Sequence, residues 1–159
     1  MCIRDSIDTC PRLFSVVVKK ELKDIFFLKQ VFQIIGAYAL DREDVRQSMK
    51  VIQQVSQDVA AGRNFLIFPE GTRSRDGNEL VEFKGGSFKC AMKAKCPIVP
   101  VAIIDSYKAF DTGSTENVNV QVHYLEPITY DEYKMLKTTE VAEIVKEKIK
   151  NTIDNYATC

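Results

Sequence analysis

The stretch "NFLIFPEGTRSRDG", residues 64–77, joins a short apolar run to a proline, an acidic residue and two arginines. Residues 64–68 are typical of a buried strand, because they form a short apolar run that ends at turn-forming residues. Pro69 ends such a strand, and Gly71 allows the chain to turn tightly. In open α/β sheets the carboxyl ends of the strands are where ligands bind. The charged residues of this stretch are therefore predicted to lie at a ligand-binding edge.

Along the rest of the chain, short apolar runs alternate with segments of helical periodicity. The predicted strands are residues 13–18, 37–40, 64–68, 96–104 and 118–125. The predicted helices are residues 21–36, 41–62, 84–95 and 138–156. Strands and helices that take turns in this way favour an α/β fold. We therefore predict a single domain with a central, mostly parallel sheet flanked by helices.

Two of these helices have well-defined apolar stripes. The helix over residues 41–62 is predicted to begin at Asp41 as its N-cap and to end at Gly62. Its apolar stripe consists of Val45, Met49, Ile52, Val55 and Val59. The stripe of the last helix consists of Val141, Ile144, Val145, Ile149 and Ile153. Each helix is expected to pack by one face.

The composition excludes several classes of protein. A chain of 159 residues with 45% hydrophobic content is large enough for one core. Its 22 basic residues equal its 22 acidic residues, which argues against a nucleic-acid-binding protein. The five cysteines and the single histidine have no zinc-like spacing, so we expect no metal and a reduced compartment. No apolar run reaches the 18 residues that a membrane-spanning helix needs.

The first residues, "MCIRDS", have neither helical nor strand periodicity, and they run abruptly into a segment that reads as the middle of a domain. We therefore expect residues 1–6 to be a non-native start and residues 7–159 to form the domain. A native disordered terminus is the alternative, since chain ends are often frayed.

Three cationic residues occupy comparable positions at element ends. Arg42 follows a short strand, Arg73 follows the strand of the opening stretch, and Lys84 precedes two glycines and a serine at the start of a helix. Helix starts bind anions through their free amides and the positive end of the helix dipole. The three cations are predicted to converge on one phosphate. Charge-assisted hydrogen bonds of about 1.5–3 kcal/mol each would bind a phosphomonoester at micromolar to millimolar concentrations.

Part of the same stretch has a simpler interpretation. Residues 75–78 have good turn chemistry of their own, so a solvated turn is the preferred interpretation there. Neither a Walker loop nor a GxGxxG motif is present, which disfavours a mononucleotide ligand.

These motifs together resemble those of a known family. "GAYALDR" (residues 36–42), "FPEGTRSRDG" (68–77), "FKGGSF" (83–88) and "CPIVPVAI" (96–103) are similar in order and spacing to blocks of the PlsC-like 1-acylglycerol-3-phosphate acyltransferases. The resemblance runs from about Leu13 to the end of the chain. It implies a glycerolipid acyltransferase-like fold and an O-acyltransferase of phospholipid biosynthesis, which transfers a fatty acyl group to lysophosphatidic acid to give phosphatidic acid. It also implies acyl-CoA or acyl-carrier protein as co-substrate, with no bound cofactor.

The resemblance also assigns roles to residues. Those expected to bind the glycerol phosphate are Arg42, Glu70, Gly71, Thr72 and Arg73. Lys84 is expected to assist, and Pro100 belongs to a block associated with the acyl chain or the acyl donor. A carboxylate repels phosphate, so Glu70 is expected either to bind a hydroxyl group or, as we prefer, to orient an arginine.

One block of the family pattern is missing. The family takes the proton from the acceptor hydroxyl with the histidine of a His-x-x-x-x-Asp motif, but no histidine precedes Arg42. If Asp8 were the motif aspartate, Ile3 would occupy the histidine position. His123 lies in a predicted strand far downstream and is expected to be a structural residue. The domain is therefore expected to lack its catalytic block and to have little activity.

The helix over residues 21–35 carries more apolar side chains than one packed face needs, with lysines beside them. A helix that lies in the interface of an anionic bilayer has this character, and so does a buried helix. With a lipid substrate we expect membrane contact, at the cytoplasmic face of the cell membrane as a peripheral protein.

Other functions fit the same residues. The acceptor is open between lysophosphatidic acid, another lysolipid and glycerol 3-phosphate. A non-catalytic phospholipid-binding domain would not need the missing histidine. A binder of phosphosugars or nucleotide phosphates would bind without regard to an acyl tail.

Overall fold

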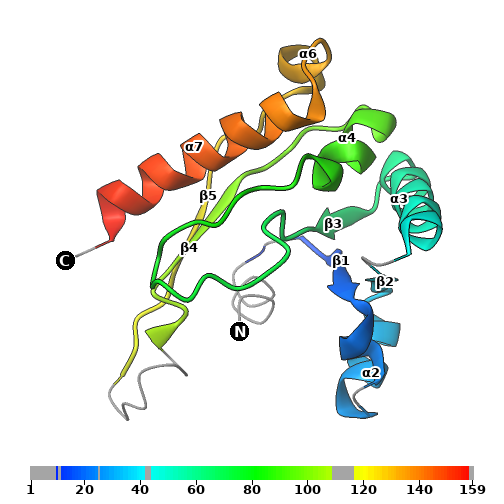
Figure 1. Ribbon diagram of the computed structural model, residues 1–159, viewed down its shortest axis with the longest axis horizontal. Coiled ribbons are helices and arrows are strands. Elements are labelled where there is room, and N and C mark those ends of the chain that lie inside the picture. Colours follow the sequence, from blue (N-terminus) through cyan, green and yellow to red (C-terminus); the bar gives the residue numbers. More distant parts are fainter. Residues whose placement is uncertain (1–9, 11, 25, 42–43, 109–116, 158–159) are drawn as a thin grey trace.

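The computed structural model describes residues 10, 12–24, 26–41, 44–108 and 117–157 (Figure 1). The elements up to the opening stretch are β1 (Phe14–Lys19), the 3-10 helix η1 (Lys20–Asp24), α2 (Phe26–Ile34), β2 (Tyr38–Leu40), α3 (Val45–Ala60) and β3 (Asn64–Leu66). Those after it are the 3-10 helix η2 (Gly85–Phe88), α4 (Lys89–Ala94), β4 (Val101–Ile104), β5 (Gln121–Tyr124), α6 (Tyr130–Tyr133) and α7 (Thr138–Tyr156). None of the helices in these ranges is both long and apolar enough to cross a bilayer.

The parallel sheet has three strands in the order β2-β1-β3. Val17 of β1 pairs with Tyr38, and Ser15 of the same strand pairs with Phe65, both in parallel register. Val16 of the central strand is fully buried, as expected for a parallel sheet covered on both faces. The predicted α/β class with a parallel sheet is confirmed.

The remaining strands form a separate antiparallel pair. Ala102 of β4 lies opposite His123 of β5, and the pairing is extended by an isolated bridge between Ile98 and Ile128. The predicted strand over residues 96–104 is longer than β4, because β4 begins only after Pro100, which has no amide hydrogen for a ladder. The predicted strand over residues 118–125 is likewise longer than β5. Figure 1 shows this pair alongside α7, apart from β1 and β2.

The start of α3 differs from the prediction. Asp44 is the N-cap, and its Oδ1 accepts a hydrogen bond from the backbone N–H of Gln47 at 3.0 Å. Asp41, the predicted cap, instead forms an ion pair with Lys20 at 3.0 Å. Both aspartates precede the apolar stripe, but only Asp44 lies three residues before an amide of the first turn, which is the reach of a capping carboxylate.

The segment before β2 is also divided differently. The predicted helix over residues 21–36 consists of η1 followed by α2, which ends at Ile34. Gly36 follows with a φ of +63°, a left-handed conformation that glycine adopts readily and that ends helices. The predicted glycine stop is confirmed.

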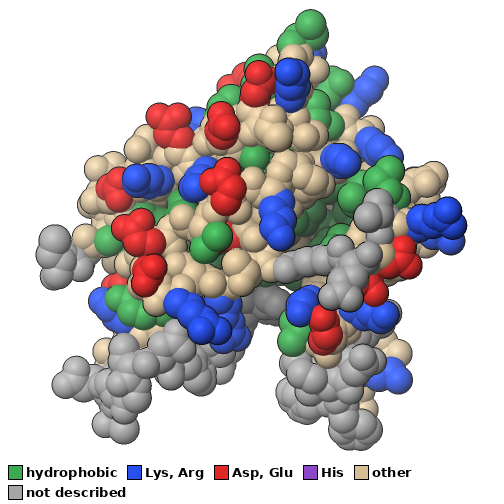
Figure 2. Space-filling model, viewed as in Figure 1, with side chains coloured by type: hydrophobic (Ala, Val, Ile, Leu, Met, Phe, Trp, Pro, Cys, Tyr) green, Lys and Arg blue, Asp and Glu red, His purple; other side chains and the backbone are tan. Residues whose placement is uncertain are grey.

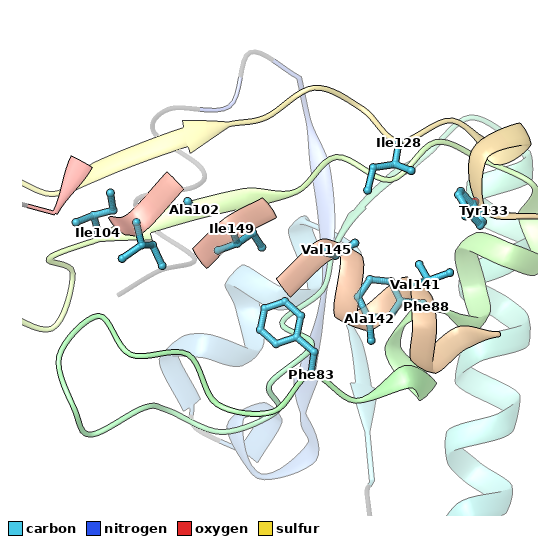
Figure 3. Packing of buried hydrophobic residues seen from close by; sticks show 11 residues of the cluster. Phe83, Phe88, Ala102, Ile104, Ile128, Tyr133, Val141, Ala142, Val145 and Ile149 are labelled. Atoms are coloured by element: carbon cyan, nitrogen blue, oxygen red, sulfur yellow. The ribbon is translucent and has the colours of Figure 1, made fainter. Parts of the chain in front are cut away.

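The largest core lies between α7, β4 and the segment around η2. Figure 3 shows Phe83 and Phe88 beside Ala142 and Val145 of α7, all of them buried. The other buried members of this cluster are Ala102, Ile104, Ile128, Tyr133, Val141, Ile149 and Ile153. Ile144, which was predicted to belong to this stripe, is 37% exposed, because it lies at the margin of the packed face.

Two smaller clusters hold the parallel sheet. In the first, α2 packs on the sheet through Phe32, which contacts Val16 and Val18 of β1. Val51 and Val55 of α3 pack with Cys90 of α4, so α3 contacts both the sheet and the helix that follows η2. The other buried or partly buried residues around this third cluster are Val17, Tyr38, Leu40, Ile52, Val59, Phe65 and Ile67. Met49, which was predicted in the stripe of α3, is instead 44% exposed.

Candidate functional site

The charged turn after β3 is closed by its own backbone. The N–H of Gly71 donates to the carbonyl of Phe68 at 3.2 Å, which makes residues 68–71 a β-turn with proline at its second position. Gly71 has a φ of +70°, where a side chain would be strained. The predicted tight turn at the carboxyl end of a parallel strand is therefore present.

Glu70 fastens this turn to a segment further along the chain. Its Oε2 accepts a hydrogen bond from the backbone N–H of Val81 at 3.0 Å. Burial raises the pKa of Glu70 above its ordinary value, and the Val81 bond and the charge of Lys146 oppose that rise. Among the described residues no arginine pairs with this carboxylate, and Arg42 lies outside them, so the role of orienting an arginine stays a prediction. In the structure Glu70 links the turn to the loop.

Lys84 is held beside the same turn. Its backbone N–H donates to the carbonyl of Pro69 at 2.9 Å, so two segments 15 positions apart are joined directly. The N–H of Ser87 then donates to the Lys84 carbonyl at 3.0 Å as η2 begins. This arrangement brings the predicted helix start next to the predicted anion-binding turn.

Three of the residues predicted to bind the phosphate are surface residues. Thr72, Arg73 and Lys84 are exposed. Within the part of the chain that the structure describes, the side chains of Arg73 and Lys84 form no ion pair or hydrogen bond. Arg42 and Asp8 lie outside the described residues, as does the expected non-native start over residues 1–6. The structure thus joins the backbones of two predicted blocks and leaves their cationic side chains available to a ligand.

Pro100 has a different environment. It is fully buried next to β4, and its carbonyl accepts a hydrogen bond from the N–H of Leu125 at 3.0 Å. It therefore forms part of the wall between the antiparallel strands and the core.

A cavity of about 180 Å³ opens between the end of α7 and the loop after the turn. It is lined by Asp76, Asn78, Glu79, Leu80, Lys150, Ile153, Asp154 and Ala157. Three carboxylates against one ammonium group disfavour an anion there. None of the predicted ligands lines this cavity, so we place the candidate site at the exposed turn and not in the cavity.

The charges of the surface are uneven. Residues 83–104 include four lysines and no acidic residue, although the whole chain is neutral by formal charge. Figure 2 shows Lys and Arg side chains over α4 and the adjoining part of α3, whereas acidic and basic side chains mix over α7. An anionic ligand at the turn would therefore lie beside a locally positive surface.

One pair of residues at this site is not predicted by the sequence pattern. Asn78 was assigned to a solvated turn, but its side chain exchanges hydrogen bonds with Asp105, which follows β4. The two residues are 27 positions apart. No local pattern in the sequence signals such a pair.

The two glycines of η2 provide a matched test of this packing. A Cβ at Gly85 would lie 3.1 Å from the backbone N of Thr139 and 3.2 Å from the carbonyl of Thr138, whereas a Cβ at Gly86 would meet nothing within 4 Å. We expect Gly85→Ala to lower the free energy of unfolding by about 1–3 kcal/mol, because a backbone at the start of α7 must shift. Gly86→Ala is expected to change it by less than about 0.5 kcal/mol. Urea unfolding followed by circular dichroism measures both, and equal midpoints would contradict the close approach.

Comparisons with known proteins find relatives of this chain. The 1-acyl-sn-glycerol-3-phosphate acyltransferase of Escherichia coli is 33% identical over 138 residues, which are 84% of this chain and 56% of that protein. The enzyme of the same name from Saccharomyces cerevisiae is 30% identical over 148 residues, 87% of this chain and 47% of that protein. The chain thus spans about half the length of the curated relatives that it matches.

A solved structure has the same fold. The crystal structure of the 1-acyl-sn-glycerophosphate acyltransferase PlsC from Thermotoga maritima matches with a TM-score of 0.72 at 20% identity, over 92% of this chain and 58% of that one. Residues 3–104 match the family described as Acyltransferase, and they include the turn, η2, α4 and β4. Because this match covers more than half of the 159 residues, the protein belongs to the Acyltransferase family.

Proposed function

We propose that this protein serves in the acylation of lysophosphatidic acid to phosphatidic acid, with acyl-CoA or acyl-carrier protein as donor and without a bound cofactor. The observation that carries the proposal is the bond from the Lys84 N–H to the Pro69 carbonyl, which sets two cationic segments side by side at the end of β3. Both segments lie within the residues that match the Acyltransferase family. The relatives named above are acyltransferases of 1-acyl-sn-glycerol-3-phosphate, which supports this acceptor.

In this proposal the phosphate of the acceptor binds at the turn. Arg73 and Lys84 supply positive charge, and Gly71 lets the backbone turn close to the ligand. Thr72, which lies between Gly71 and Arg73 in the chain, is exposed and offers a hydroxyl group. Arg42 is proposed as a third cation on the strength of the family resemblance. Glu70 supports the turn from the side of the loop.

Acyl transfer also needs a base for the acceptor hydroxyl. His123 is the only histidine, and it lies in β5, where its Nε2 is 3.1 Å from Oε1 of Gln121 and its ring stacks on Tyr156. These contacts support a structural role. General acid–base catalysis is typically worth about 10²–10⁴-fold. We therefore propose that this chain binds the acceptor far better than it turns it over.

The missing histidine equally favours a second function, that of a phospholipid-binding domain without catalysis. The two functions differ in one measurement. Slow transfer of a labelled acyl group from acyl-CoA to lysophosphatidic acid, above the rate without protein, supports the enzyme. Binding of the lipid without any such transfer supports the binding domain.

Membrane contact is proposed through α2. Ile34 at the end of this helix is 85% exposed, and Lys29 is exposed as well, while Phe32 is buried. An exposed isoleucine with a nearby lysine suits the interface of an anionic bilayer. The proposed location is the cytoplasmic face of the cell membrane.

Calorimetric titration tests the proposed acceptor. Lysophosphatidic acid is expected to bind more tightly than glycerol 3-phosphate, because burial of acyl carbons adds about 0.8 kcal/mol per CH₂ group. Glycerol 3-phosphate is expected to bind more tightly than inorganic phosphate. Equal affinity for the ligands with and without an acyl chain would favour a binder of phosphosugars or nucleotide phosphates. Absence of binding to all three would overturn the proposed function.

A further inference from the structure

The loop that carries Arg73 is anchored at its base. The bond between Glu70 and Val81 and the bond between Pro69 and Lys84, at 3.0 Å and 2.9 Å, bring the two ends of this loop together. Arg73 lies between the anchors and forms no ion pair or hydrogen bond with any described residue. These two bonds therefore do not by themselves fix the part of the loop that carries Arg73.

The tip of the loop has an anchor of its own. Nδ2 of Asn78 donates to Oδ1 of Asp105 at 3.0 Å, and the backbone N–H of Asp105 donates to Oδ1 of Asn78 at 2.8 Å. Asp105 is only 9% exposed, and its Oδ2 forms an ion pair with Lys108 at 3.0 Å. Two hydrogen bonds between the same two residues fix both the position and the orientation of Asn78.

The backbone at both partners is adapted to this contact. Asp105 has a φ of +64°, a left-handed conformation that aspartate and asparagine tolerate better than most residues. Gly77 has a φ of +59° and lies against the ring of Tyr107, where an added Cβ would come within 3.4 Å of the ring. Residues 77 and 78 therefore dock together on residues 105–107.

We propose that the pair of Asn78 and Asp105 positions the anion-binding turn, so that Arg73 is held near Lys84 before a ligand arrives. The inference rests on the proposed function, because it assumes that the phosphate binds at this turn. Only a few residues separate Gly71 from Asn78, so fixing Asn78 limits how far Arg73 can move. A loop that is ordered in advance loses less entropy when the ligand binds. Neither residue touches the ligand.

A reciprocal exchange tests the pair. Asn78→Asp sets two carboxylates against each other, whereas Asp105→Asn keeps an amide oxygen that can accept from Asn78 and removes only the ion pair with Lys108. The double variant restores one amide and one carboxylate, and the carboxylate at position 78 still accepts the backbone N–H of position 105. Asp105→Asn is compatible with the positive φ at position 105. The readout is the affinity for glycerol 3-phosphate, measured by calorimetry at a temperature where circular dichroism is native for each variant.

Asn78→Asp is expected to weaken binding by about tenfold, and adding Asp105→Asn in the double exchange is expected to recover most of the loss. Asp105→Asn alone is expected to weaken binding by less than about threefold. Asn78→Ala removes both bonds without opposing charges and is expected to weaken binding to a similar extent, which covers the case of a single exchange that fails to fold. The control is Tyr38→Phe, which removes a 3.1 Å hydrogen bond to Asp58 at the other end of the sheet. It is expected to lower the melting temperature and leave the affinity unchanged.

The outcomes separate the two proposals. A wild-type protein that binds neither glycerol 3-phosphate nor lysophosphatidic acid overturns the proposed function and the inference with it. A wild-type protein that binds, together with folded Asn78→Asp and Asn78→Ala variants of unchanged affinity, overturns the positioning role alone. Loss of affinity in Asn78→Asp without recovery in the double variant also counts against the pair.

Discussion

Val145→Asp is expected to lower the free energy of unfolding by about 4 kcal/mol or more, whereas Ile144→Asp is expected to change it little. Val145 is 3% exposed and lies in the core between α7, β4 and the segment around η2. A carboxylate there would be buried without a partner, which is among the few single changes that cost about 4 kcal/mol or more. A domain of this size has a free energy of unfolding of about 5–15 kcal/mol, so a large share of the stability would be lost.

Ile144 is the matched control, because it is the preceding residue of the same helix and has a similar size. Its side chain is 37% exposed, so a carboxylate there can remain in water. Thermal unfolding followed by far-ultraviolet circular dichroism measures both variants. Similar melting temperatures for the two would show that α7 does not pack by the face that the structure assigns to it.

The sequence predicted best those elements whose pattern is local and repeated. The helix over residues 138–156 was predicted with the bounds that the structure gives, because its apolar spacing continues for several turns. The strand that ends at the charged turn was predicted for a similar reason, since Pro69 and Gly71 mark its end in the sequence itself. Even so, periodicity could not tell that Ile144 lies at the margin of the stripe.

The contacts that hold the candidate site together were beyond such reasoning. The bond from the Val81 N–H to Glu70 crosses 11 positions, and the contact between Asn78 and Asp105 crosses 27. Glu70 is expected from the sequence to orient an arginine, and the sequence gives no sign that the backbone amide of Val81 also donates to it. Contacts between residues this far apart in the sequence depend on how the strands are arranged in space. The antiparallel pairing of β4 with β5 has no signature in either strand alone.

On the proposed function, Arg73→Ala is expected to weaken the binding of lysophosphatidic acid about ten- to hundredfold. Hydrogen bonds to charged groups contribute about 1.5–3 kcal/mol, and each 1.4 kcal/mol corresponds to a factor of ten in affinity. The side chain is exposed and has no ion pair among the described residues, so its removal should not change the melting temperature. Calorimetric titration with the lipid at constant ionic strength measures the change.

Arg75→Ala is the control for this experiment, since Arg75 is an exposed arginine of the same loop, two residues further on. Arg75 and Arg73 both attract the phosphate over long range by their positive charge, and salt screens this attraction over about 10 Å at 0.1 M. A direct contact to the phosphate adds a geometric requirement that only Arg73 is proposed to meet. The loss at Arg73 should therefore exceed the loss at Arg75 at both low and high salt. If the two variants lose affinity equally, and the difference from wild type disappears in salt, the phosphate is attracted by the charge of the loop and is not bound by Arg73.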